Sequence, residues 1–75
     1  MALIEKLSRE EQQFRHQDAV KCTYDVLTDE SGQKYLQLLT YGSEDRQNLG
    51  TVSQNIRFGP TGLAALKRIL QEHSL

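Results

Sequence analysis

Residues 34–58, KYLQLLTYGSEDRQNLGTVSQNIRF, decide the fold, because two strand patterns flank a polar connection. In residues 51–58 the side chains alternate, which is typical of a strand with two different faces. One face carries Val52, Gln54, Ile56 and Phe58, and the other carries Thr51, Ser53, Asn55 and Arg57. Residues 34–41 have apolar side chains on both faces, which predicts a middle strand. Residues 42–50 are polar and bounded by glycines, which predicts a loop.

A further strand and a helix flank this stretch. Residues 19–28 alternate between Val20, Cys22, Tyr24 and Val26 on one side and Lys21, Thr23 and Asp25 on the other, which predicts a half-buried strand. Residues 29–33 have turn chemistry, with Gly32 free to take a positive φ. Pro60 cannot continue a strand but suits the first turn of a helix, so we expect a helix from Pro60 or Thr61 to His73.

The N-terminal residues allow two interpretations. Leu3, Leu7 and Phe14 share one broad face of a helix over residues 3–16. Alternatively, a helix begins at Ser8 with a capping box, and Leu3, Ile4 and Leu7 form an extended arm before it.

The sequence therefore predicts an α+β fold. A small antiparallel sheet of three or more strands packs on the C-terminal helix, with residues 1–17 as a helix or arm and 18–75 as a β-β-β-α domain. We expect the core to be Leu36, Leu38, Val52, Ile56 and Phe58, under Leu63, Leu66 and Leu70. The opposite sheet face would carry Tyr35, Gln37, Tyr41, Ser53, Asn55 and Arg57.

Size and composition favour association. A chain of 75 residues buries only about 60% of its unfolded surface, so small domains need additional stabilisation. The single cysteine, Cys22, excludes an internal disulfide and a multi-cysteine zinc site. A homodimer is therefore expected, without a metal or other cofactor.

No segment of the sequence is apolar for long enough to be a signal peptide or a membrane span. We therefore expect a cytoplasmic protein that does not bind a membrane.

Catalytic chemistry is not indicated. No histidine lies near Cys22 in sequence to activate it as a nucleophile, and its alternation with Val20 and Tyr24 predicts a buried small side chain. The paired acids Glu10-Glu11 and Asp29-Glu30 fit a solvated helix face and a turn. We therefore expect that the protein is not an enzyme.

Binding is better supported by the residue types. Single-stranded nucleic acid is held by aromatic rings that stack on bases and by cations and amides that contact phosphates. The net charge is −1, but cations outnumber anions in residues 34–75 while anions dominate residues 1–33. The candidate contacts are Lys34, Tyr35, Gln37, Tyr41, Arg46, Ser53, Asn55 and Arg57.

Residues 34–70 resemble the C-terminal domain of the transcriptional positive-cofactor-four family. The resemblance rests on the strand KYLQLLTY, the polar loop, the strand GTVSQNIRF and the helix PTGLAALKRIL. It implies a homodimer whose helices pack together and whose curved sheets form a groove for single-stranded DNA or melted duplex, with a role in transcription regulation. Carried over by position, it implies contacts from Lys34, Tyr35, Gln37, Arg46, Ser53, Gln54 and Arg57. The chain departs from the family in being slightly acidic overall, which predicts weaker attraction to phosphates.

Two other classes of function remain open. Three strands and a helix can enter the major groove of duplex DNA, although this chain has few arginines for contacts with base edges. Alternatively, the protein is a small interaction or regulatory module that docks another protein through a sheet edge or its N-terminal segment, without binding nucleic acid.

Overall fold

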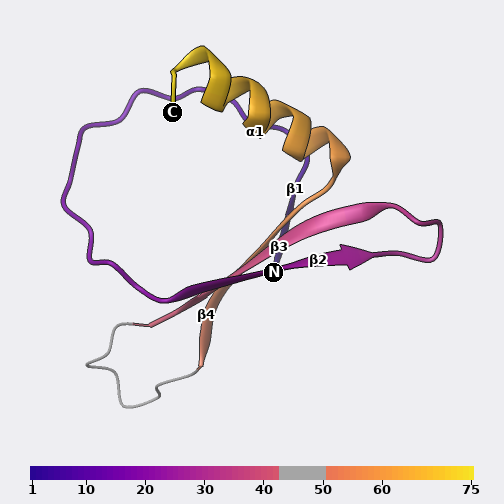
Figure 1. Cartoon of the computed structure of the whole chain (residues 1–75). Helices are drawn as coiled ribbons and strands as arrows, with labels where there is room; N and C mark the ends of the chain where they lie inside the picture. The colour runs from indigo at the N-terminus through magenta and orange to yellow at the C-terminus, as the bar shows by residue number, and fades with distance from the viewer. Residues whose placement is uncertain (43–50) are drawn as a thin grey trace.

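The computed structural model describes residues 1–42 and 51–75, where the chain forms one sheet and one helix (Figure 1). The elements are β1 (Ala2–Ile4), β2 (Cys22–Thr28), β3 (Lys34–Tyr41), β4 (Val52–Phe58) and α1 (Pro60–Glu72). The sheet order is β1-β4-β3-β2, with β1 parallel to β4 and the other pairs antiparallel. The α+β class is confirmed, whereas the prediction of an antiparallel sheet is wrong, because the sheet is mixed.

The unexpected strand is β1. Ala2, Leu3 and Ile4 pair with Ile56, Arg57 and Phe58. A strand this short shows no usable alternation in sequence, and it forms because the edge of β4 is free to accept it. β1 and β2 therefore lie at opposite edges of the sheet, and the chain between them must cross its whole width.

The hairpin between β2 and β3 has the turn that its sequence predicts. The Asp29 carboxylate accepts hydrogen bonds from the backbone N–H groups of Ser31 and Gln33, both at 2.9 Å, and from the Ser31 hydroxyl at 2.7 Å. Gly32 has a φ of 86°, which a residue with a side chain rarely adopts. The turn fixes the register that pairs Asp25 with Gln37.

A β-bulge interrupts the pairing of β3 with β4. Thr40 pairs with Gln54, but Tyr41 pairs with Val52, so Ser53 is the extra residue in β4. The predicted alternation through residues 51–58 therefore holds from Gln54 to Phe58 and fails at Ser53 and Val52.

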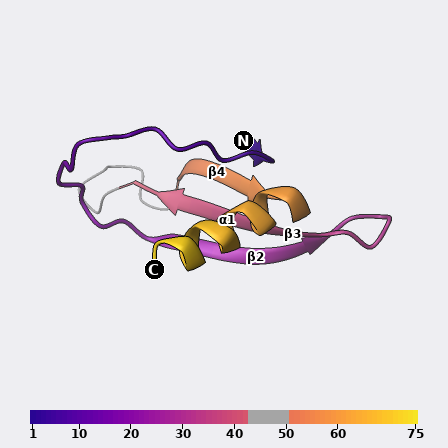
Figure 2. The same cartoon turned by 90° about the horizontal axis from the view of Figure 1, so that it is seen from above.

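Helix α1 packs on one face of the sheet, which we call the helix face. A Cβ atom at Gly62 would overlap the backbone carbonyl of Ile4 and lie 3.4 Å from the Phe58 ring, so the first turn of α1 lies directly on β1 and β4. Helix α1 contacts β3 and β4, and Figure 2 shows its C-terminal turns running on across the view toward β2. The register places Ile4, Leu36, Leu38, Ile56 and Phe58 together on this face, each half-buried.

The helix covers less than the sequence predicts. Val52 and Leu70, both expected in the core, are 43% and 40% exposed, because the bulge shifts Val52 and the last turns of α1 extend beyond the sheet contact. Cys22 is exposed instead of buried. Among the described residues no apolar side chain is fully buried.

Residues 5–21, which we call the arm, contain neither helix nor strand. Of the predicted helix or arm, the structure has the arm, without a helix from Leu3 or Ser8. The strand predicted over residues 19–28 begins at Cys22 instead of Ala19. A short helix needs tertiary packing along its apolar stripe, and the side chain of Phe14 is 95% exposed. Figure 1 shows the arm leaving β1, passing α1 and returning in a wide arc to β2.

Candidate nucleic-acid interface

The sheet face opposite α1, which we call the outer face, carries polar and aromatic side chains, with Leu39 between Gln37 and Tyr41 on β3. The register pairs Gln37 with Arg57 and Leu39 with Asn55 on neighbouring strands, so these four side chains share one face. Tyr35 and Tyr41 lie on the same face of β3 because side chains alternate along a strand. The sheet therefore brings Tyr35, Gln37, Tyr41, Asn55 and Arg57 onto one surface.

The centre of the outer face is an arginine held by an amide. The Arg57 guanidinium donates to the Gln37 side-chain oxygen from Nε at 3.1 Å and from Nη2 at 2.6 Å. Two bonds to one acceptor hold the guanidinium plane in place. A guanidinium has five N–H donors, so this arrangement leaves donors of Arg57 free to bind an anion.

Asn55 adds a polar atom beside this pair. Its Oδ1 atom is buried and finds no hydrogen-bond partner among the described residues. An unpaired buried acceptor costs free energy, so a donor that reached it would stabilise the protein.

Tyr35 lies at one end of β3, where it contacts the hairpin turn. Its hydroxyl donates to the Asp29 carboxylate at 3.0 Å, and this bond raises the pKa of the Tyr35 phenol. The pKa of Asp29 is lowered, mainly by the Ser31 hydroxyl and then by the Gln33 N–H. A Cβ atom at Gly59 would lie 3.3 Å from the Tyr35 ring, so the absence of a side chain at Gly59 leaves room for this ring.

Tyr41 lies at the other end of β3, next to a cation. The Lys21 ammonium is 5.1 Å from the centre of the Tyr41 ring, within the range of a cation–π contact. The Tyr41 backbone N–H also donates to the Lys21 carbonyl at 3.0 Å. Along β3 the two tyrosines are about 20 Å apart at about 3.3 Å per residue, a span that accommodates several nucleotides.

Other predicted contacts lie elsewhere. Lys34 pairs with Thr28 and lies on the helix face, as does Gln54, which pairs with Thr40. Ser53 is the bulge residue, not a member of the Asn55–Arg57 row. Arg46 lies outside the described residues.

Sequence analysis missed two charged residues of the outer face. The alternation of residues 19–28 puts Lys21 and Asp25 on one side of their strand. Only the pairing of β2 with β3 shows that Lys21 lies beside Tyr41 and that Asp25 lies beside Gln37. Asp25 is exposed, and its Oδ1 atom accepts the Val26 N–H at 2.8 Å. Its negative charge near Arg57 weakens the attraction of this face for phosphates.

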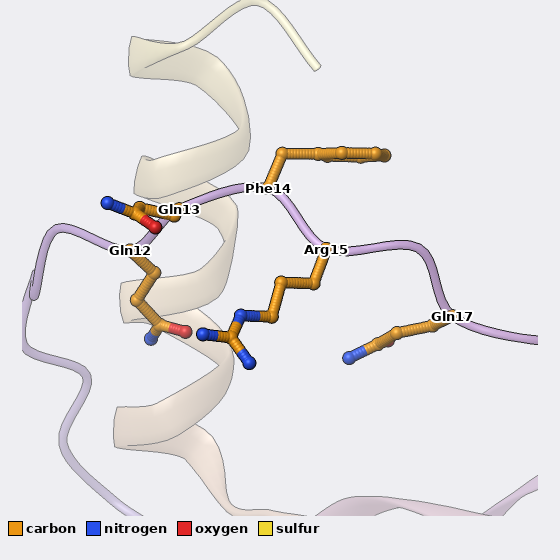
Figure 3. A pocket seen from close by; sticks show the side chains of 5 residues that line it. All are labelled: Gln12, Gln13, Phe14, Arg15 and Gln17. Carbon is orange, nitrogen blue, oxygen red and sulfur yellow. The ribbon is translucent and has the colours of Figure 1, made fainter.

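A hollow in the described part of the chain lies along the arm. The hollow in Figure 3 is lined by Gln12, Gln13, Phe14, Arg15 and Gln17, all from the arm, with side chains pointing in different directions. In residues 1–42 and 51–75, no three His, Cys, Asp or Glu side chains gather into a possible metal site. The described chain also contains no helix that is long and apolar enough to cross a membrane.

No protein-family model, no curated protein and no solved structure matches this chain.

Proposed function

We propose that the protein binds single-stranded nucleic acid on the outer face and does so as a homodimer. The observation that carries this proposal is that the Arg57–Gln37 pair lies between Tyr35 and Tyr41 on the sheet face opposite α1, where all four side chains are half-buried. Aromatic rings stack on bases and the guanidinium contacts a phosphate, which are the two contacts that retain a single strand. A role in transcription regulation, implied by the resemblance to the positive-cofactor-four family, is part of the same proposal.

Charge explains why two copies are needed. Among the described residues of one copy, Lys21 and Arg57 are the cations placed on the outer face, and Asp25 opposes them. Phosphate affinity grows with the number of cations engaged. A dimer doubles that number along one bound strand.

Fluorescence anisotropy with labelled oligothymidine, oligouridine and a duplex of equal length tests the proposal. We expect oligothymidine to bind more tightly than the duplex, with an affinity that falls as salt rises. Tighter binding of the duplex would favour contacts in the major groove, and no binding at low salt would contradict the proposal. The oligouridine measurement decides between DNA and RNA.

The matched variants are Arg57→Gln and Lys34→Gln, because they remove one charge each from opposite faces of the sheet. Arg57→Gln is expected to lower affinity by about 10- to 100-fold, since a hydrogen bond to a charged group contributes about 1.5–3 kcal/mol and 1.4 kcal/mol corresponds to about tenfold. The plot of log affinity against log salt should also become less steep. Its slope should fall by about 0.7 for each contact between a protein cation and a phosphate that the variant loses. Equal losses in both variants would show that the outer face is not the site.

The second candidate is a protein-interaction module that does not bind nucleic acid. It is favoured by the exposed apolar side chains of β2, with Tyr24 74% and Val26 54% exposed. Exposed apolar patches of this kind mark protein contacts. If neither DNA nor RNA binds at low salt, this candidate replaces the first.

A further inference from the structure

The isolated chain exposes far more surface than a folded monomer of its mass. Its accessible surface is 6815 Å², whereas a compact monomer of 8.6 kDa exposes about 4,700 Å². The radius of gyration of 14.6 Å likewise exceeds the value of about 11 Å for a compact domain of this length. The excess surface is about 2,100 Å², well above the roughly 800 Å² that each partner buries in a stable interface.

The arm accounts for part of this excess. The arm joins strands at opposite edges of the sheet, which are three strand spacings or about 14 Å apart. Fully extended, the arm would span about 55 Å, so it is much longer than the connection within one copy requires. Residues 5–20 make no backbone–backbone hydrogen bond in the described chain, and Leu7 is their one half-buried residue. Ordering such a segment costs conformational entropy, and its own protomer provides few contacts that offset the cost.

An unoccupied apolar surface lies on the helix face of β2. Cys22, Tyr24 and Val26 point to this face, and all three are exposed. Helix α1 lies against β3 and β4, so this part of the face is largely open. We call Tyr24 and Val26 the β2 patch.

We propose that the arm of each copy crosses to a second copy, where Phe14 covers the β2 patch. The Phe14 ring is 95% exposed in its own protomer, and a buried phenylalanine removes about 150–250 Å² from water. Each copy carries one arm and one β2 patch. In a closed dimer with two-fold symmetry, the arm of each copy therefore covers the patch of the other. The inference rests on the homodimer of the proposed function but not on nucleic-acid binding. The arm exchange and the nucleic-acid binding can therefore each be contradicted without the other.

Disulfide trapping tests the contact directly. Cys22 is the natural cysteine beside the β2 patch, so Phe14→Cys is expected to form a covalent dimer under mild oxidation. The control is Arg15→Cys, because the Arg15 side chain leaves the arm on the other side from Phe14 (Figure 3). Adding Cys22→Ser to Phe14→Cys should abolish the cross-link. A disulfide within one chain, or equal cross-linking of both variants, would overturn the exchange.

Sedimentation gives a second measurement. The wild-type chain should have twice the monomer mass at micromolar concentration, and Phe14→Ala should raise the dimer dissociation constant at least tenfold while Arg15→Ala leaves it unchanged. A monomeric wild type, or equal constants for Phe14→Ala and wild type, would overturn the exchange. If the wild type dimerises and binds oligothymidine but Phe14→Cys does not cross-link, the arm exchange fails and the proposed function stands.

Discussion

Arg57 and Gln37 lie on neighbouring strands, and the Gln37 side-chain oxygen accepts two hydrogen bonds from the Arg57 guanidinium, at 3.1 and 2.6 Å. The pair lies at the centre of the outer face and sets the direction in which Arg57 presents its remaining donors. Replacing Gln37 therefore removes the group that orients the Arg57 guanidinium but leaves the positive charge of Arg57 in the protein.

Gln37→Ala is expected to weaken oligothymidine binding a few-fold without changing the slope of affinity against salt, because the number of cations stays the same. The variant should also lose about 0.5–1.5 kcal/mol of stability with the hydrogen bonds. Anisotropy at several salt concentrations and urea denaturation measure the two effects. Gln37→Glu is the informative control, since its carboxylate would neutralise Arg57 and reduce the slope. A reduced slope in Gln37→Ala would contradict the orienting role.

Gly62→Ala is expected to destabilise the protein, because overpacking usually costs about 1–3 kcal/mol. Its Cβ atom would overlap the Ile4 carbonyl, and a backbone atom of a paired strand cannot easily move. This cost should exceed the gain of about 1 kcal/mol in helix propensity. Urea denaturation at one protein concentration measures the difference, with exposed Thr61→Ala as the control in the same turn. A stabilised Gly62→Ala would show that α1 does not lie on β1.

The shifted pKa values of Asp29, mainly caused by the Ser31 hydroxyl, and of Tyr35, mainly caused by the bond to Asp29, lead to two predictions about pH. Because the pKa of Asp29 is lowered in the fold, its contribution to stability is present above the unfolded pKa of about 3.9 and is lost as pH falls through the folded value. Because the pKa of Tyr35 is raised, its contribution is present below about pH 10 and is lost as pH rises through the folded value.

NMR titration of the Asp29 carboxyl carbon and ultraviolet titration of the tyrosines measure these values. Ser31→Ala should move the pKa of Asp29 upward more than Tyr35→Phe does, since the Ser31 hydroxyl is the larger cause of its shift. An unchanged pKa of Asp29 in Ser31→Ala would contradict the turn geometry.

Local chemistry explains which elements were predictable. The predicted bounds 34–41 agree with β3, and the helix begins at Pro60, because strand alternation and the proline restriction act within a few residues. The positive φ of Gly32 follows equally from its turn sequence. The shared outer face of Gln37, Asn55 and Arg57 also follows from alternation, since these residues lie away from the bulge.

The sequence by itself determined the three longer strands, the hairpin turn and the helix. Only the tertiary structure decided the parallel addition of β1, the bulge at Ser53, the opposite faces of Lys34 and Arg57, and the extended arm. The physical reason is range: propensity and periodicity act between near neighbours, whereas strand register and the covering of an apolar face depend on residues distant in sequence. The arm shows the limit most clearly, because its capping box and apolar spacing favour a helix, but in the described structure Leu7 is its one half-buried residue, so little packing stabilises a helix there.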